Sequence, residues 1–300
     1  MIEIPKEIRI SLIKLIMLII FYLLSTYNNK KTSFKGVAMC VIAKNENLYI
    51  NEFLTYYKNL GVKKIFLYDN NDPFGENITE VISNDIKSNF VELIDVRGKE
   101  EYQVEAYNDC YQKHLNNYSW FLFVDVDEFL YIKNNISLTD YLTDKRFINC
   151  SNIHFNYKEF GDSGLLDYDE RPIKERFTKN FRYILAIKTI VKGGIKHAKM
   201  HIHRSLNVQN YCNSNGEKII PGDIYTDKIT VENAEIRHYI TKTIGEFYKR
   251  LIRGWPCMKH GSDNYYKFVN HRIDYFFNLN EVTKEKFNKV YSLITDKALL

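Results

Sequence analysis

Two carboxylates separated by one residue give the strongest chemical signal in the sequence. Asp125 and Asp127 follow residues 120–124, a very apolar run that predicts a buried strand. In an extended chain alternate side chains share a face, so both carboxylates can bind one cation. Hard oxygen ligands suit Mg²⁺ or Mn²⁺, and such a cation can neutralise a leaving phosphate. We therefore expect a metal site at the end of this strand, with the side chain of Glu128 pointing away from it.

The elements that must position these carboxylates follow from the pattern of apolar residues. In the first half of the chain, short apolar runs alternate with segments in which apolar residues recur at helical spacing. Strands that alternate with helices indicate an α/β fold with a mostly parallel, doubly wound sheet. The predicted strands are 37–43, 64–68, 91–96 and 120–124, and the predicted helices between them are 46–60, 78–86 and 103–115.

Polar residues stand where each predicted strand ends. Doubly wound sheets bind ligands beyond the carboxyl ends of their strands, so these residues are expected to line one site. They are Asn45 and Glu46 after the first strand, Asp69 and Asn70 after the second, Asp95 and Arg97 at the third, and Asp125 and Asp127 after the fourth. No G-x-G-x-x-G follows the first strand and no G-x-x-x-x-G-K-[ST] occurs, which argues against a dinucleotide-binding fold and a P-loop NTPase.

Composition and charge exclude several classes of protein. The 300 residues contain 42 Lys and Arg against 37 Asp and Glu, a net charge of +5. That excess is small for a dedicated nucleic-acid binder but suits a membrane surface or an anionic small substrate. The five cysteines are widely spaced with no C-x-x-C pair, which excludes a disulfide scaffold and a zinc ribbon and leaves one or two bridges open. Asn-X-Ser/Thr sequences also occur, but such matches arise by chance in an Asn-rich chain and do not fix the compartment.

The N-terminus carries a strongly apolar segment at residues 8–24, interrupted near its start by Arg9 and Lys14. A membrane-spanning helix needs about 20 mostly apolar residues, and no small-residue cleavage site follows this run. We therefore expect residues 1–27 to be a single-pass membrane anchor and the polar residues 28–35 to be a linker. An interfacial or packed helix is the alternative, in which case the protein is cytoplasmic and membrane-associated.

Several short motifs, taken in order, resemble a known class of enzyme. Asn45-Glu46, Tyr68-Asp69-Asn70 and Asp125-Val126-Asp127-Glu128-Phe129 resemble the nucleotide-sugar glycosyltransferases of the GT-A type. Further segments resemble one branch, glycosyltransferase family 92 and its bacterial family 2-like relatives. These segments are Gln103, 160–164, 188–191, His238-Tyr239, 242–247 and Arg253-Gly254. The resemblance implies a GT-A domain over residues 36–255, with a mostly parallel mixed sheet flanked by helices, and a C-terminal helical extension over residues 256–300.

The same resemblance implies a reaction and its ligands. The enzyme would move a sugar from a nucleotide donor, a UDP-sugar, to a glycan or glycoconjugate acceptor, with inversion at the anomeric carbon. Asp125 and Asp127 would hold a Mn²⁺ or Mg²⁺ ion together with a late histidine, His238 first and His201 or His203 behind it. No nucleic-acid partner is expected. The donor site would be lined by Asn45, Glu46, Asp69, Asn70, Gln103, Asp125 and Lys188.

Inverting transfer also needs a general base beside the acceptor hydroxyl. Glu159 and Asp162, next to the Phe-Gly motif, are the first candidates, ahead of three acids in the loop that follows. Cations are expected to steady the leaving diphosphate. The loop acids are Asp167, Asp169 and Glu170, and the cations are Lys188, Lys242, Arg250 and Arg253.

Two other functions stay open. Asp125 could be the nucleophile and Asp127 the acid/base of a phosphatase or phosphotransferase. Phe129 stands where that chemistry predicts Thr or Val, and three strands come first, so the pattern disfavours it. The fold could also serve a non-catalytic protein that binds a nucleotide or a sugar. The intact Asp-x-Asp sequence disfavours this function, because decayed enzymes often lose their metal ligands.

Overall fold

The computed structural model describes residues 15–19, 34–179, 181–222, 224–254 and 262–297. The chain divides into two units, Met1–Lys35 and Gly36–Leu300. Residues 15–19 form a short helix with exposed side chains, and most of the predicted anchor and linker lies outside the described residues. Within the part of the chain that is described, no helix combines the length and the apolar character that crossing a membrane requires. The membrane anchor therefore stays a prediction.

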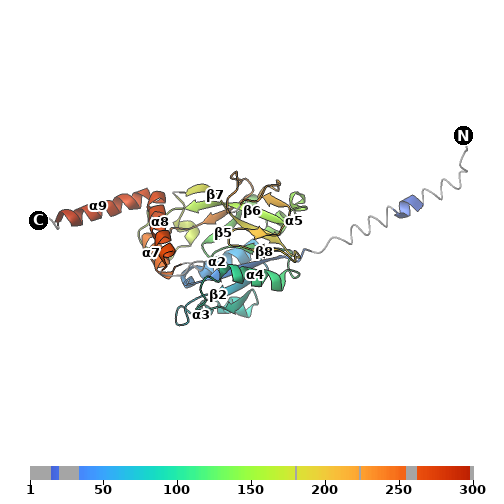
Figure 1. Ribbon diagram of the computed structural model, residues 1–300, viewed down its shortest axis with the longest axis horizontal. Coiled ribbons are helices and arrows are strands. Elements are labelled where there is room, and N and C mark those ends of the chain that lie inside the picture. Colours follow the sequence, from blue (N-terminus) through green and yellow to red (C-terminus); the bar gives the residue numbers. More distant parts are fainter. Residues whose placement is uncertain (1–14, 20–33, 180, 223, 255–261, 298–300) are drawn as a thin grey trace, which may run out of the picture. The chain divides into compact units, whose positions relative to one another are not determined.

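The second unit is built on one nine-stranded mixed sheet flanked by helices (Figure 1). Its order is β3-β2-β1-β4-β7-β6-β11-β5, with β10 paired to the start of β6. The predicted α/β fold is confirmed. The strands are β1 (Val37–Ala43), β2 (Lys64–Asp69), β3 (Val91–Asp95), β4 (Trp120–Phe123), β5 (Glu128–Ile132), β6 (Asn152–Phe160), β7 (Phe181–Lys192), β10 (Tyr211–Asn213) and β11 (Ala234–His238), and β8 (Lys199–Met200) pairs separately with β9 (Ser205–Leu206).

The predicted strands and helices of the first half are confirmed to within one residue. β1 is buried along its whole length, as expected for a strand with parallel neighbours on both sides. The first helix ends at Gly61, whose left-handed conformation (φ 102°) lets its N–H bond carbonyls of the last turn. The helices are α2 (Asn47–Leu60), α3 (Ile78–Lys87), α4 (Gln103–His114), α5 (Leu138–Thr143), α6 (Ile173–Arg176), α7 (Ile244–Arg253), α8 (Asp263–Leu279) and α9 (Glu281–Lys297).

The second half of the sheet departs from the parallel pattern. β7 runs antiparallel to both β4 and β6, and β5 runs antiparallel to β11. β6 and β11 run parallel to each other, and therefore in the direction of β4. The carboxyl ends of β1, β2, β4, β6 and β11 thus meet the starts of β5 and β7 at one edge of the sheet. We call this edge the site edge.

Two disulfides cross-link this unit, and they answer the question that the cysteine spacing left open. Cys40 in β1 is bonded to Cys110 in α4, and Cys150, just before β6, is bonded to Cys212 in β10. All four side chains are buried. The fifth cysteine, Cys257, lies outside the described residues. Each bridge therefore joins two elements that are far apart in the sequence.

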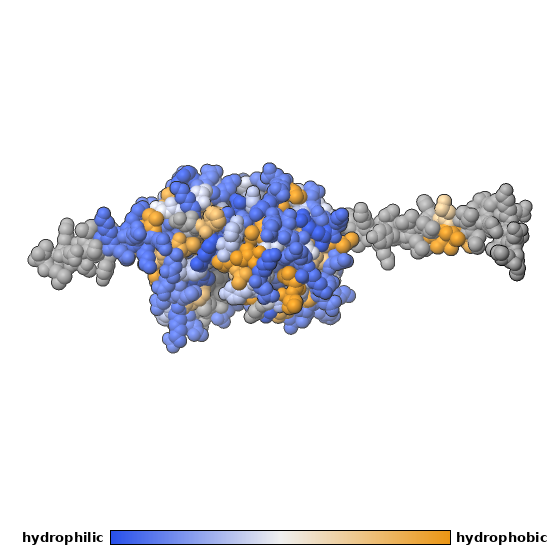
Figure 2. Space-filling model, turned by 90° about the horizontal axis from the view of Figure 1, so that it is seen from above, coloured by the Kyte–Doolittle hydropathy of each residue, from blue (hydrophilic) through white to orange (hydrophobic). Residues whose placement is uncertain are grey.

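The last helices follow β11, which ends at the site edge. α7 begins with a capping box, in which the side chains of Thr243 and Glu246 each bond the backbone of the other. α8 packs on α7 through Phe276 and Phe247, whose ring centroids lie 4.6 Å apart. The face seen in Figure 2 is largely hydrophilic, with hydrophobic residues in separate patches. This distribution is expected when most apolar side chains are buried between a sheet and its helices.

Candidate active site

Asp125, whose side chain is 34% exposed, lies against a cluster of buried polar side chains. Its Oδ1 accepts hydrogen bonds from Gln103 Nε2 at 2.8 Å and from the Tyr107 hydroxyl at 3.3 Å. Its Oδ2 lies 3.2 Å from Nζ of Lys188, a side chain with no exposed surface. Desolvation alone would raise the pKa of Asp125, but the Lys188 ammonium, together with His203 and His238, outweighs it and holds the pKa below its usual value. The structure thus brings together the predicted Gln103, Asp125 and Lys188.

Glu128 belongs to the same cluster, so the expectation that it points away is wrong. The chain turns after Asp125, and the Glu128 N–H donates to the Asp125 carbonyl at 3.0 Å. The turn brings back the Glu128 carboxylate, whose Oε2 accepts the Asp125 N–H at 3.0 Å and lies 3.3 Å from Lys188 Nζ. Burial, only partly offset by Lys188, raises the pKa of Glu128 to about 7. The alternation of an extended strand does not apply across such a turn.

Asp127 is surrounded by cationic groups. Its Oδ2 is paired with Arg250, and it lies 4.0 Å from Lys242 Nζ and 3.8 Å from His238 Nε2. Burial would raise the pKa of Asp127, but Arg250 and Lys242 outweigh it and hold the pKa well below its usual range. The carboxylate predicted to bind a metal is therefore held by two of the cations predicted to bind a diphosphate.

His238 lies between two carboxylates on neighbouring strands. The strand register pairs it with Glu128 of β5 on one side and with Glu159 of β6 on the other. His238 Nδ1 lies 3.7 Å from Glu159 Oε1, and Nε2 lies 3.9 Å from Glu128 Oε1. Both ring nitrogens are buried, and neither has a hydrogen-bond partner within the described residues. We call residues 125–128 the acidic turn. The His238 ring thus lies between the first predicted base, Glu159, and the acidic turn.

Glu159, the first predicted base, is fixed by groups from three elements. Its Oε2 accepts hydrogen bonds from Arg182 Nε of β7 at 3.2 Å and from the Tyr275 hydroxyl of α8, and its Oε1 faces His238 of β11. Burial would raise the pKa of Glu159, but His238, Tyr275 and Arg182 outweigh it and lower the pKa. The structure therefore brings Glu159 and His238 together.

Asp162, the second predicted base, holds the turn that follows β6. Its side chain is fully buried, Oδ1 accepts the Gly164 N–H at 2.8 Å, and Oδ2 accepts the Thr283 hydroxyl. Its own N–H donates to Asn280 Oδ1 at 2.7 Å. These bonds dock the start of α9 onto the turn. The carboxylate of Asp162 is thus used for packing, and its contacts do not bring it together with Glu159.

The residues predicted after β2 hold two neighbouring loops together. Asp69 Oδ1 accepts hydrogen bonds from the Asn71 N–H at 3.0 Å and from Asn71 Nδ2 at 2.7 Å, and Asp69 Oδ2 lies 3.2 Å from Arg97 Nε. Asn70 Nδ2 donates to two carbonyls of the loop at residues 96–99, at 3.1 and 2.8 Å. These side chains shape the site edge where β2 and β3 end.

The residues predicted after β1 connect that strand to α7. Asn45 adopts a left-handed backbone conformation (φ 53°) and donates its N–H to Asn71 Oδ1 at 2.7 Å. The Glu46 carboxylate is paired with Arg253, whose Nη1 also donates to the Lys44 carbonyl at 2.7 Å. One face of α7 thus reaches both Asp127, through Arg250, and the end of β1, through Arg253.

Two cavities open among these residues. A cavity of about 590 Å³ lies between the start of α2 and α7, and one of about 50 Å³ lies against the acidic turn. Glu46, Arg250 and Arg253 line both. Cavities of about 300–1,000 Å³ are typical of small-ligand sites. A larger cavity of about 810 Å³, along α2 and β5, contains none of the predicted site residues. The first cavity is also lined by Asn45, Lys242 and Lys249, and the second by Gln103, Asp125 and Asp127.

Of the three histidines His197, His201 and His203, it is His203 that interacts with Asp125 and Lys188 of this site. Its Nδ1 lies 3.0 Å from the Ile187 carbonyl, so the tautomer with a proton on Nδ1 leaves Nε2 as the acceptor of the ring. Burial, with the charge of Lys188, lowers the pKa of His203 to about 4, and the ring is neutral at pH 7. His197 and His201 have exposed side chains. Among these histidines, His203 is therefore the one placed to act as a ligand.

The donor groups of the site fit a hard divalent cation in kind. Asp125 and Asp127 offer carboxylate oxygens at the small cavity, and His238 offers two buried ring nitrogens. In the present arrangement, no three His, Cys, Asp or Glu side chains of the described ranges are grouped as a metal site. Arg250 is paired with the Asp127 carboxylate. A cation that binds both carboxylates must therefore displace Arg250 from Asp127.

Three residues of the site were missed by the sequence analysis. Tyr107 lies four residues after Gln103, and this spacing places both on one face of α4, which is a usable signal. Arg182 reaches Glu159 because the register of β6 and β7 sets the two residues opposite each other. Tyr275 reaches Glu159 from α8. The last two contacts depend on strand pairing and helix docking, for which local sequence gives no signal.

The fold and the site define an α/β protein whose sheet edge presents carboxylates beside a cavity lined by both cationic and acidic side chains. The family profile of glycosyltransferase family 92 matches residues 35–289, and the chain belongs to this family. A glycosyltransferase family 92 protein of Ricinus communis is 25% identical over 158 residues, which are 52% of this chain and 28% of that protein. A glycosyltransferase family 92 protein of Oryza sativa subsp. japonica is 29% identical over 116 residues, which are 38% of this chain and 20% of that protein.

The chain spans less than a third of the length of these curated relatives. Among solved structures, the crystal structure of S. aureus TarS matches with a TM-score of 0.33 and 13% sequence identity. That match covers 52% of this chain and 28% of TarS. Family membership therefore rests on the sequence profile and the curated relatives.

Proposed function

We propose that this chain transfers a sugar from a nucleotide-diphosphate donor, a UDP-sugar, to a glycan or glycoconjugate acceptor, with inversion at the anomeric carbon. The observation that carries the proposal is the cavity of about 590 Å³ lined by Lys242, Arg250 and Arg253, beside the carboxylates of Asp125 and Asp127. Cations suit a diphosphate, and carboxylates beside them are explained by a divalent cation. Membership of glycosyltransferase family 92 supports the same reaction.

The cations of α7 are the proposed diphosphate site. Arg250 and Arg253 are three residues apart and share one helix face, and they reach from Asp127 to Glu46. Burial lowers the pKa of Lys242, and the nearby Arg250 and Arg253 add to the effect although Asp127 and Glu46 oppose it. An anionic group between these cations would relieve their mutual repulsion. Crowded cations beside a cavity therefore favour a ligand with at least two negative charges.

A Mn²⁺ or Mg²⁺ ion held by Asp125 and Asp127, with His238 as a further ligand, would neutralise charge on the leaving diphosphate. Side chains of the protein position the carboxylates and the phosphates. Gln103 and Lys188 fix the Asp125 carboxylate from two sides. Arg250 is paired with Asp127 in the present arrangement and lines the larger cavity, so it can bind phosphate once it leaves that carboxylate.

Glu159 is the proposed general base. The acceptor oxygen forms a bond to the anomeric carbon while the bond from that carbon to the diphosphate oxygen breaks on the opposite face. The proton of the acceptor hydroxyl passes to the Glu159 carboxylate, and the nucleoside diphosphate leaves as an anion. Arg182 holds this carboxylate in place. The Tyr275 hydroxyl is also bonded to it, so an acceptor hydroxyl must replace that contact.

Thermal unfolding with Mn²⁺ and a panel of nucleotides and nucleotide sugars tests the donor site. A ligand that binds only the folded state raises the unfolding temperature. We expect a shift that needs both Mn²⁺ and a UDP-sugar, and we expect Asp127→Asn to lose it. Asp169→Asn, which changes an exposed acid paired with Arg171, is the matched control and should shift as the unchanged protein does.

The outcome separates the candidate functions. A Mn²⁺-dependent shift together with transfer of the sugar to an acceptor supports the transferase. The same shift without any turnover favours a non-catalytic binding protein. If the folded protein shifts with no nucleotide at all, the donor-site assignment is wrong.

A further inference from the structure

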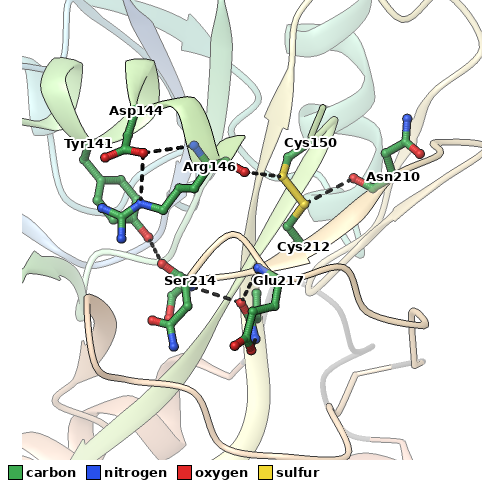
Figure 3. The surroundings of a disulfide bond; sticks show 10 residues. Tyr141, Asp144, Arg146, Cys150, Asn210, Cys212, Ser214 and Glu217 are labelled. Carbon is green, nitrogen blue, oxygen red and sulfur yellow. Dashed lines mark hydrogen bonds and ion pairs between the residues drawn. A yellow bond between two sulfur atoms is a disulfide. The ribbon is translucent and has the colours of Figure 1, made fainter. Parts of the chain in front are cut away.

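Four of the five cysteines are closed into two buried bridges. Cys40 and Cys110 lie within the hydrophobic core cluster, between the central strand β1 and α4. The Cys150–Cys212 bridge joins the segment just before β6 to the short strand β10 (Figure 3). Disulfides form and persist in oxidising compartments and are rare where thioredoxin and glutathione keep thiols reduced. Two such bridges in one domain point to folding in an oxidising environment.

The surroundings of the second bridge are those of a structural pair. The sulfurs of Cys150 and Cys212 lie 3.7 and 3.9 Å from the carbonyl oxygens of Arg146 and Asn210 (Figure 3). Carbonyl oxygens do not stabilise a thiolate, so these sulfurs lack the setting of a catalytic or metal-binding cysteine. Burial also hides both bridges from exchange with soluble thiols. Their role is therefore to fix the fold, which requires that they stay closed.

A second, independent observation concerns asparagine. Each Asn-X-Ser/Thr sequence of the chain has its asparagine exposed, and none of these asparagines lies inside an α-helix or a strand of the sheet. Asn135 is the last residue of a three-residue 3-10 helix. A glycan on the side-chain nitrogen can extend into solvent from such positions without displacing packed groups. The asparagines are Asn77, Asn117, Asn135 and Asn149.

Three of these asparagines share one place in the fold. Asn117 precedes β4, Asn149 precedes β6, and Asn135 follows β5, which runs in the opposite direction. All three therefore lie at the edge of the sheet opposite the site edge. Asn77 differs, because it follows β2 at the site edge and its Oδ1 caps α3 by accepting the Thr79 N–H at 3.2 Å.

We propose that residues 36–300 fold in an oxidising secretory compartment and carry N-linked glycans on Asn117, Asn135 and Asn149. The glycan donor is the lipid-pyrophosphate-linked oligosaccharide of that compartment. Nδ2 loses a proton and bonds to the anomeric carbon of the oligosaccharide as the bond from that carbon to pyrophosphate breaks. Glycans at the edge opposite the candidate active site leave its cavities open. The proposal does not depend on the transferase activity.

The glycosylation test uses the full chain, with its own N-terminus, in a eukaryotic cell that has a secretory pathway. We expect peptide-N-glycosidase to increase the electrophoretic mobility of the protein. The triple variant Asn117→Gln/Asn135→Gln/Asn149→Gln should migrate as the treated protein does. Asn116→Gln and Asn134→Gln are neighbouring exposed asparagines outside any acceptor sequence, and these control variants should keep the shift. A triple variant that keeps the full shift of the unchanged chain, or no shift in the unchanged chain, overturns the assignment of these three sites.

Counting thiols tests the bridges in the same samples. The denatured protein is treated with a polyethylene glycol maleimide before and after reduction. We expect one adduct before reduction, at Cys257, and five after it. Five adducts before reduction would mean that the chain folds with free thiols, and this result overturns the oxidising compartment. One adduct without any glycan keeps the bridges and removes the three acceptor sites.

Discussion

Among the carboxylates of the acidic turn, Glu128 is the one whose pKa the fold raises. Its carboxylate is buried, and it lies beside Asp125 as well as Lys188. Burial raises its pKa from 4.5 to about 7 although Lys188 opposes the change. Because the folded-state pKa lies above the unfolded value, the stability that protonated Glu128 gives is complete below about pH 4.5 and is lost as the pH rises through 7.

Glu128→Gln should remove this pH dependence. We expect the free energy of unfolding of the variant, relative to the unchanged protein, to rise by about 3 kcal/mol between pH 5 and pH 8, since one pKa unit is worth about 1.4 kcal/mol. Urea unfolding at several pH values measures the difference. Glu175→Gln changes an exposed carboxylate and should leave the profile unchanged. A constant difference between Glu128→Gln and the unchanged protein would contradict the raised pKa.

Glu159 and Asp162 offer a paired test of the general base, because both are buried acids close in sequence. Glu159→Gln keeps the size of the side chain but removes its ability to take a proton, and a base contributes about 10²–10⁴-fold to the rate. We expect kcat to fall by about that factor, while the thermal shift with donor is retained. Transfer assays and thermal unfolding with the donor measure the two effects.

Asp162→Asn should lower the stability of the protein and leave its turnover largely intact. Its carboxylate bonds Gly164 and Thr283 and so docks α9, and a lost buried hydrogen bond costs about 1–3 kcal/mol. The variant should unfold at a lower temperature and keep most of its kcat. If Asp162→Asn instead loses turnover at full stability, the two predicted bases must exchange their roles.

At the scale of single elements, α7 carries two arginines that bind opposite ends of the site. Arg253→Met should weaken the binding of the donor by about 10–100-fold, because a hydrogen bond to a charged group is worth about 1.5–3 kcal/mol. Lys249→Met is the matched control, since Lys249 is on the same helix and lines the same cavity but has an exposed side chain. Calorimetric titration with the nucleoside diphosphate measures both. Equal losses in the two variants would mean that only the net charge of α7 matters.

The helices and strands could be predicted from the sequence where their residues follow local patterns of apolar spacing and end signals. The boundaries of β1 and α2 follow from a continuous apolar run, from helical spacing and from the stop at Gly61. The turn between Asp125 and Glu128 was not predictable, because the acidic sequence continues the strand pattern and the turn is set by hydrogen bonds to the returning carboxylate. For this reason the sequence placed Asp125 at the end of the strand, as the structure has it, and oriented Glu128 wrongly.

The same local patterns could not predict contacts between segments that are distant in the sequence. The sequence proposed both Glu159 and Asp162, and contacts between distant segments separate them. Glu159 meets Arg182 and His238 of the neighbouring strands. The docked helices also differ, since Tyr275 bonds Glu159 and Thr283 bonds Asp162. The bridges of Cys40 and Cys150 were equally hidden, because wide spacing does not reveal which cysteines meet. Local sequence therefore predicts which residue types reach an edge of the sheet, and tertiary packing decides what each one does there.

Removing each disulfide in turn tests which of the two bridged pairs of elements matters for donor binding. They join residues 70 and 62 positions apart, so the chain-entropy estimate predicts a similar loss of about 4 kcal/mol when either is removed. Only Cys40–Cys110 anchors α4, the helix that brings Gln103 and Tyr107 to Asp125. We expect Cys40→Ser/Cys110→Ser to weaken donor binding in addition to stability, and Cys150→Ser/Cys212→Ser to lower stability alone.

Urea unfolding and donor titration of both double variants check this prediction. The measurements are made under conditions in which both variants are fully folded, so that binding is not confused with unfolding. Equal donor affinities in the two variants would show that α4 keeps its position without the bridge. A much smaller loss of stability in one variant would mean that its reduced chain retains structure in the unfolded state.

At the scale of the whole molecule, the site edge joins a parallel half of the sheet to a half that contains antiparallel strands. The parallel strands β1, β2 and β4 supply Asn45, Asp69 and Asp125, which belong to the proposed donor side. The antiparallel half supplies Glu159 and His238. α8 and α9 touch the second half through Tyr275 and Thr283, at Glu159 and Asp162 respectively, and α8 packs on α7 through Phe276. If Glu159 is the base, as proposed, the C-terminal helices lie on the proposed acceptor side of the site.

A chain that ends at Gly254 should keep donor binding and lose transfer to the acceptor. The shortened protein loses the partners of Glu159 and Phe247, and the newly exposed phenylalanine costs about 2 kcal/mol of stability. We expect it to keep the Mn²⁺-dependent thermal shift with the donor, because Arg250, Arg253 and the acidic turn remain. It should lose transfer to the acceptor, because the helices that pack beside Glu159 and hold the turn after β6 are gone. Transfer at the full rate by the shortened chain would exclude α8 and α9 from the acceptor side, and a chain that does not fold would make them part of the core structure instead.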